Sequence, residues 1–347
     1  MEPQQVHRAI LINLLVALGP TAVQSEPFQI EDVTSPASLA LSELKPNTIA
    51  FSDRPAAEAV DGHIGLMRFE DWSRISPIQK RLLGLYESYQ EPTINVTAHG
   101  VTRPYKEKLH LYVAQGRFLL SKPATRIDLT RYATLDFIAS IDPAIKHELI
   151  TPADVLPLRD PQSAHNQHPH RRWCAGAQVI CMKSRYRLEG KFPTVIRLIN
   201  KVDEGSKVSD FFEFQSELRT LPQNELDQAT FAQLTDINST VVGVLEQSLF
   251  YVNQVMQFGK LVAVLQAHPG DVGKTVASVF VVLAIETDVL ELKKDFGRYP
   301  VLRNLVPAQV LLGNSSFNAG TSLSAGLPQF TRHRLKAIAD ILSQSGS

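Results

Sequence analysis

The sequence lacks an excess of charge of either sign: 35 lysine and arginine residues balance 35 aspartate and glutamate residues. Proteins that bind nucleic acid or an anionic membrane through their overall field usually carry a clear positive charge. The balance therefore argues against nucleic acid as a partner. With 44% hydrophobic and 20% charged residues, the composition is that of a globular protein, not of a disordered chain.

Long apolar runs are also missing, and the longest ones are too short for a membrane helix of ~20 residues. The first 25 residues instead fit an export signal: a polar start precedes an apolar block, 9–18, that ends at Gly19-Pro20. Cleavage after Ser25 fits the small-residue rule, and cleavage after Ala22 is the alternative. We expect a periplasmic or secreted protein with no transmembrane span in the mature chain. The competing interpretation is a buried first helix.

Cysteine is scarce, because only Cys174 and Cys181 occur. In an exported protein such a pair most simply forms a disulfide, which here closes a short loop containing Gly176. A bridge of this kind contributes about 2 to 3 kcal/mol to stability. In a cytosolic protein the two residues would more typically be free buried thiols. With export expected, the sequence predicts a Cys174–Cys181 disulfide.

Familiar enzyme motifs are incomplete. Residues 270–275 end like a phosphate-binding loop, but His268 occupies the position of the required first glycine. Residues 313–317 break the Gly-x-Ser-x-Gly elbow at the last position, and no His-Glu-x-x-His occurs. A serine triad with His333 stays conceivable, because triads are defined by geometry and not by order. We expect a protein without catalysis and without a cofactor.

The best metal candidate is a cluster of imidazoles on a proline-rich loop, formed by His165, His168 and His170 and followed by Cys174. Three imidazoles and a thiolate would complete a four-coordinate zinc or copper site. The alternative is a solvated loop whose Cys174 is already used in the disulfide.

The strongest positive signal is a dense run of apolar and β-branched residues from 241 to 285. Residues 241–245, 248–258, 261–265 and 275–285 are predicted to be strands of one sheet, with a tight reversal at Gly259-Lys260. Both parities of the last strand are apolar, which predicts that it is covered on both faces.

Turn- and loop-forming residues along the chain predict a division into four regions. These are a signal peptide (1–25), an N-terminal α+β region (26–150), a linker or loop rich in proline and histidine (151–170), and an antiparallel-sheet domain with a C-terminal helix (171–347). Within the last region, a hairpin pairs 194–202 with 208–218 and turns Glu213 and Glu217 outward. The closing helix, 328–342, has an apolar stripe, with Arg332, Arg334 and Lys336 mostly on its solvent side.

This order of elements in 185–345, strands followed by a closing helix, resembles the helix-grip, START-like arrangement. The resemblance implies an α+β fold in which a curved antiparallel sheet wraps a long C-terminal helix and leaves a lipid-sized cavity between them. It rests on element order alone and carries no residues with it.

Polar residues inside the predicted core strands are candidates for ligand binding, because burying them is costly unless each finds a partner. They could orient a ligand in a mostly apolar pocket. The alternative is an ion pair of Glu246 with Arg303, with the amides exposed. The candidates are Glu246, Asn253, Gln254 and Gln257 in the core strands, with Arg303 and Asn304 in the later apolar run 301–312.

The sequence thus favours an exported, non-catalytic protein that binds an apolar or amphipathic small molecule or a cell-envelope component. One rival is an envelope hydrolase or metal-dependent enzyme that uses the loop 165–170. The other is a purely structural envelope protein.

Overall fold

A computed structural model describes most of the chain after the predicted signal peptide. The described residues are 26–53, 66–75, 93–98, 101–106, 109–141, 143, 145–155, 173–176, 179–187, 211–221, 223–252, 256–286 and 323–344. The predicted signal peptide and cleavage site, strand 194–202 and most of the linker 151–170 lie outside these ranges.

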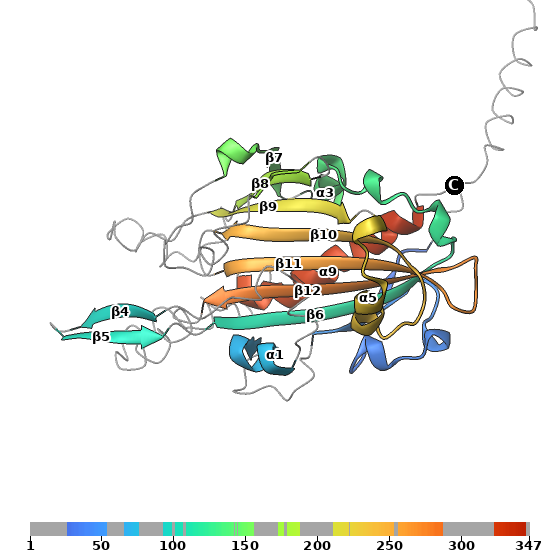
Figure 1. Ribbon diagram of the computed structural model, residues 1–347, viewed down its shortest axis with the longest axis horizontal. Helices are drawn as coiled ribbons and strands as arrows, with labels where there is room; N and C mark the ends of the chain where they lie inside the picture. The colour runs from blue at the N-terminus through green and yellow to red at the C-terminus, as the bar shows by residue number, and fades with distance from the viewer. Residues whose placement is uncertain are drawn as a thin grey trace, which may run out of the picture.

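One large, mostly antiparallel sheet organises the described residues (Figure 1). Its strand order is β1-β2-β6-β12-β11-β10-β9-β8-β7, and β3 also pairs with β6. Only the β1–β2 pair is parallel among these described strands. The strands are β1 (Gln29–Asp32), β2 (Thr48–Ser52), β3 (Leu66–Arg68), β6 (Leu109–Leu120), β7 (Lys146–Leu149), β8 (Val179–Arg187), β9 (Phe211–Leu221), β10 (Val241–Val252), β11 (Met256–Ala267) and β12 (Thr275–Glu286).

The central hairpins use longer strands than the sequence predicts. Residues 241–252 form the single strand β10, and β11 continues through Gly259-Lys260, so the predicted reversal at that dipeptide is wrong. Gly259 lies directly opposite Leu283, and a Cβ atom on it would approach Leu283 Cδ2 to 2.8 Å. The glycine therefore allows the Leu283 side chain to pack closely against the strand, and it does not form a turn.

Strand β12 is buried on both faces, as predicted, because different helices cover the two sides of the sheet. Alternate residues Ala277, Val279, Val281 and Leu283 join a core cluster with α9 (Leu323–Gln344) and α3 (Leu135–Ile141). The intervening residues Phe280, Val282 and Ala284 pack with α1 (Phe69–Ile75) and α5 (Gln228–Thr235). Figure 1 shows α9 behind the strands and α5 in front of them. We call these sides the α9 face and the opposite face.

The remaining elements are short. Strands β4 (Thr93–Ala98) and β5 (Val101–Lys106) form a separate two-stranded sheet at one end of the main sheet (Figure 1). Short 3-10 helices occur at Pro36–Ser38, Leu41–Glu43, Ala124–Arg126, Leu129–Arg131, Pro152–Asp154 and Gln223–Glu225.

Helix α9 confirms the predicted closing helix and extends it at both ends, with Pro328 inside it. Leu335, Ile338 and Leu342 are buried against the sheet. Leu335 lies over Gly116 of β6, where a Cβ atom would come within 3.1 Å of Leu335 Cδ1. Arg334 is only 6% exposed, so its expected position on the solvent side is wrong.

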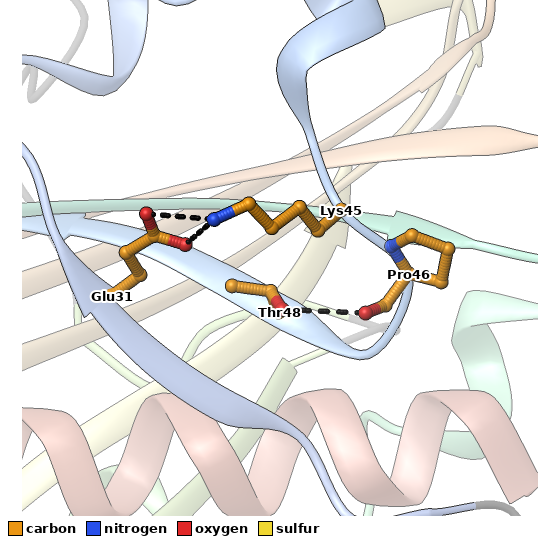
Figure 2. Close-up of polar contacts among 4 residues, drawn as sticks. All are labelled: Glu31, Lys45, Pro46 and Thr48. Carbon is orange, nitrogen blue, oxygen red and sulfur yellow. Dashed lines mark hydrogen bonds and ion pairs between the residues drawn. The ribbon is translucent and has the colours of Figure 1, made fainter.

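The first two strands attach the N-terminal residues to this core. Figure 2 shows Lys45 reaching Glu31 across the β1–β2 connection, with Nζ 2.8 Å from Oε2. In the same view Thr48 Oγ1 donates to the carbonyl oxygen of Pro46. Phe28 N donates to Asp340 Oδ1 at 2.8 Å, which links this arm to α9. Strands from the two predicted regions, 26–150 and 171–347, therefore belong to one sheet.

The predicted disulfide is present between Cys174 and Cys181. It fixes residues 173–176 against the opposite face, where the Trp173 ring stacks on Phe250 with centroids 4.4 Å apart. Beneath it, Cys174 N donates to Glu217 Oε2. Glu217 is 4% and Glu213 9% exposed, so their predicted outward orientation is wrong. The alternation of apolar and charged residues in β9 correctly placed the two glutamates on the face away from the apolar core of that strand. That face is itself covered, so the glutamates are buried.

The observed fold is α+β, a mostly antiparallel sheet with a long C-terminal helix packed on one face, as the sequence predicts. Among the described helices, none is both long enough and apolar enough to cross a membrane.

Candidate functional site

A group of polar side chains interrupts the apolar layer between α9 and the sheet. Strands β7, β8, β9 and β10 each contribute one of them, and α9 contributes the fifth. We call this set the polar row: His147, Ser184, Ser216, Gln247 and Arg334. It lies on the α9 face, because its strand residues share their parity with apolar core residues such as Met182 and Leu245.

Two cross-strand hydrogen bonds build the row. His147 and Ser184 are direct partners of β7 and β8, and His147 Nδ1 lies 2.8 Å from Ser184 Oγ. Gln247 Nε2 donates to Ser216 Oγ at 3.2 Å between β10 and β9. The two serines occupy diagonal positions on β8 and β9, since Ser216 pairs with Met182 and not with Ser184. The two bonds therefore form adjoining parts of one polar line across four strands.

Arg334 reaches this line from α9. Its Nη2 donates to Gln247 Oε1 at 3.0 Å, and its Cζ lies 5.3 Å from the centre of the Phe330 ring, one turn earlier in the helix. Ser184, Ser216 and Gln247 are each 2% exposed or less. The Arg334 guanidinium thus lies among polar side chains that are almost fully buried from solvent, and it contacts the face of an aromatic ring.

His147 is the group in the row whose titration is most altered. Burial, together with the positive charge of Arg334, lowers its pKa from 6.5 to about 4. The ring is therefore neutral at physiological pH. Its Nε2 atom is buried and has no hydrogen-bond partner among the described residues. A buried ring nitrogen of this kind can donate to or accept from a bound molecule, depending on the tautomer.

Apolar side chains surround the polar row on the same face. Phe214 and Leu218 of β9 are buried, whereas Ile180, Leu249 and Leu261 are only partly buried. A few polar groups converging within a mostly apolar lining is the composition typical of small-molecule sites. The arrangement can orient the polar end of a ligand while its apolar part contacts these side chains.

The His147–Ser184 pair also has the elements of a nucleophile and a base. A general base works best when its pKa lies near the operating pH, and a pKa of about 4 makes His147 a weak base at neutral pH. Ser184 is 0% exposed. The chemistry of the row thus favours binding over acyl transfer. His333, the histidine considered for a triad, is exposed on α9.

The predicted ligand residue Glu246 lies on the opposite face, away from the polar row. Its Oε2 accepts from Arg219 Nε at 2.9 Å and from Lys260 Nζ at 3.1 Å. Burial alone would raise the pKa of Glu246, but the charges of Lys260 and Arg219 outweigh it and lower the pKa below its ordinary value. Glu246 therefore belongs to a buried ion cluster, formed with Lys260 and Arg219.

The other predicted site residues are placed only in part. Gln257 is a residue of strand β11. Asn253, Gln254, Arg303 and Asn304 lie outside the described residues, as do the metal candidates His165, His168 and His170. Within the ranges that the structure describes, no three histidine, cysteine, aspartate or glutamate side chains gather into a possible metal site.

Sequence reasoning missed all five members of the polar row, although part of the signal was present. Ser216 lies between the inward-facing Phe214 and Leu218, and Gln247 lies between Leu245 and Leu249. A polar residue at the parity of two core neighbours marks a buried polar position. His147 gave no such signal, because only strand pairing brings it opposite Ser184.

Comparisons with known proteins place the chain in no family. No protein-family model matches it, and no curated protein matches its sequence. Among solved structures, it is similar to the Zhui aromatase/cyclase from Streptomyces sp. R1128, with 10% identity, a TM-score of 0.31, and coverage of 68% of this chain and 94% of that one. It is also similar to norcoclaurine synthase from Thalictrum flavum, solved with dopamine and hydroxybenzaldehyde, with 10% identity, a TM-score of 0.28, and coverage of 59% and 89%. Both superpositions are loose, so the function proposed below rests on the geometry of this chain.

Proposed function

We propose that the protein binds an amphipathic small molecule on its α9 face, between α9 and strands β7 to β11, without transforming it. The observation that carries this proposal is the polar row, which places nearly dry polar side chains and a buried arginine in an otherwise apolar layer. Polar groups in such a layer cost free energy, and a ligand that uses them offsets that cost. The partly buried Leu249 and Leu261 would contact the apolar part of the ligand.

Two properties of the row support a binding role. His147 keeps one ring nitrogen without a partner among the described residues, so it can still form a hydrogen bond to a ligand. The side chains beside it are fixed by the bonds Gln247–Ser216 and Arg334–Gln247. A site whose groups are already held in place loses little conformational entropy when it binds.

The test uses the uncharged fluorophore N-phenyl-1-naphthylamine and the purified mature protein. We expect saturable binding to the wild type. Leu249→Trp should weaken it at least about tenfold, equivalent to ~1.4 kcal/mol, because the indole would occupy the proposed site. Val272→Trp is the matched control, since Val272 is 94% exposed in the β11–β12 loop. Absence of saturable binding to the wild type, or equal binding by Leu249→Trp, would overturn the proposal.

We further propose that the protein acts outside the cytoplasm, in the periplasm or as a secreted protein. The Cys174–Cys181 disulfide supports this location, because disulfides persist mainly in oxidising compartments. Cell fractionation followed by intact-mass measurement tests it. The expected result is a chain in the exported fraction that lacks residues 1–25 or 1–22. A full-length chain confined to the cytoplasm would contradict it.

A further inference from the structure

The sequence contains three copies of the acceptor motif for N-linked glycosylation, which begin at Asn95, Asn238 and Asn314. The motif is Asn, then any residue except proline, then Ser or Thr. Asn95 belongs to strand β4, where it pairs with Pro104, and Asn314 lies outside the described residues. Asn238 is the one whose motif and flanking residues the structure describes in full. It lies in the connection between α5 and β10.

The backbone of this connection is fixed from its first residue. Asp236 ends α5 in the left-handed conformation, with φ of 53°, which is a common way for a helix to stop. The next residue, Ile237, donates its N–H to Ala232 O at 3.3 Å, and its side chain is only 3% exposed. Asn238 therefore follows directly after an anchored, buried residue.

Gln266 of β11 holds the two carbonyl groups on either side of Asn238. Its Nε2 donates to Ile237 O at 3.0 Å and to Ser239 O at 3.4 Å, and Gln266 is 0% exposed. Ser239 N also donates to Ile237 O at 3.1 Å, so Asn238 is the central residue of a three-residue turn. Because both carbonyls point inward to a buried amide, Asn238 forms the outer apex of the turn.

The two residues of the motif that glycosylation requires are both on the surface. Asn238 and Thr240 are exposed, whereas the middle residue, Ser239, is partly buried. An N-linked glycan is bulky and hydrophilic, so it is tolerated only where it extends into solvent. A sugar on the apex of this turn does so while the buried Ile237 and Gln266 keep their positions.

We propose that Asn238 is an N-glycosylation site that is modified once the chain has left the cytoplasm. Asn238 Nδ2 forms a bond to C1 of the first sugar of a lipid-pyrophosphate-linked oligosaccharide. The bond from C1 to the pyrophosphate oxygen breaks, and the lipid pyrophosphate leaves with the electron pair. One amide proton passes to a base of the oligosaccharyltransferase that catalyses the transfer. The inference rests on the location proposed above and is independent of the proposed ligand binding.

Intact-mass measurement and peptide mapping of the protein purified from its exported fraction test the site. The expected result is a processed chain with added sugar mass, located on the peptide that contains Asn238. An exported chain with the mass of the bare polypeptide, or with sugar only at Asn95 or Asn314, would overturn the inference and leave the proposed location intact. A full-length chain confined to the cytoplasm would overturn both.

Variants then assign the modification to the motif. Asn238→Gln and Thr240→Ala should each abolish the sugar on this peptide, while the backbone oxygen of Thr240 still accepts from Ala267 N. Thr240→Ser and Ser239→Ala should both keep it, because each preserves the motif. Ser239 Oγ has no hydrogen-bond partner among the described residues, so this control removes no such bond. Loss of the sugar in Ser239→Ala, or its retention in Thr240→Ala, would contradict the assignment.

Discussion

His147 has a lowered pKa because burial removes its solvation and Arg334 disfavours a second positive charge nearby. An unfolded histidine titrates near pH 6.5, and the folded one near 4. Between these values the unfolded state binds the proton and the folded state does not. The contribution of His147 to stability is therefore fully present above pH 6.5 and is lost as the pH falls toward 4.

We expect this loss to be about 1 to 3 kcal/mol, the lower value applying if the partly exposed ring is well screened. Urea unfolding between pH 4.5 and 7.5 measures it. In His147→Gln the slope of stability with pH should be smaller, whereas His333→Gln, on the exposed side of α9, should keep the wild-type slope. An unchanged slope in His147→Gln would contradict the lowered pKa.

Glu246 forms ion pairs with Arg219 and Lys260 on the opposite face, and the Lys260 side chain is only 2% exposed. Glu246→Ala would remove the carboxylate beside these charges, which typically costs about 3 to 5 kcal/mol for a buried pair. The exposed pair Glu31–Lys45 is the control, and Lys45→Ala should cost less than about 1 kcal/mol. Denaturant unfolding at pH 7 compares the two variants. Equal effects would show that the Glu246 cluster is not a buried ion cluster in solution.

At the scale of elements, the disulfide determines where residues 173–176 lie. It ties them to β8, which places Trp173 on Phe250 above the buried Glu217. The bridge closes a short loop, with a sequence separation of 7. Its stabilising effect comes mainly from restricting the unfolded chain, although the stacked ring adds apolar burial in the folded one.

Replacing both cysteines, Cys174→Ser with Cys181→Ser, should lower the free energy of unfolding by about 2 to 3 kcal/mol. It should also shift the emission of Trp173 to longer wavelength as the ring leaves Phe250. Measurement in a Trp72→Phe background isolates this signal, because Trp72 and Trp173 are the two tryptophans of the chain. An unchanged emission spectrum would mean that the loop stays on the opposite face without the bridge.

At the scale of the whole molecule, β6 and β12 join residues that are far apart in the sequence. They pair from Thr275↔Leu120 to Glu286↔Leu109, the full length of both strands. Neither strand can separate without breaking this ladder and exposing both covered faces. We therefore expect the two predicted regions, 26–150 and 171–347, to unfold together.

Differential scanning calorimetry tests this cooperativity. One transition is expected, with equal calorimetric and van't Hoff enthalpies. Hydrogen exchange should show comparable protection in β6 and β12, since the two strands share their hydrogen bonds. Two separate transitions, with β6 unprotected in the first, would show that the N-terminal strands are an independent unit.

Local signals were sufficient for much of the architecture. The dense apolar and β-branched residues predicted β12, the apolar stripe predicted α9, and the scarcity of cysteine predicted the disulfide. The reversal at Gly259 was predicted wrongly because a glycine in a strand and a glycine in a turn look alike in sequence. Close packing against Leu283 distinguishes them, and that contact comes from a distant strand.

The sequence by itself determined that the core region 241–285 is built of strands, the α+β class and the cysteine pair, because each depends on residues close together in the chain or on composition. Only the tertiary structure decided that both faces of the sheet are covered, that Arg334 and Glu217 are buried, and that Glu246 pairs with Lys260 on the face away from α9. It also brought His147, Ser184, Ser216 and Gln247 into one polar line. The physical reason is that burial and partner choice depend on strand order, which sets residues distant in sequence side by side.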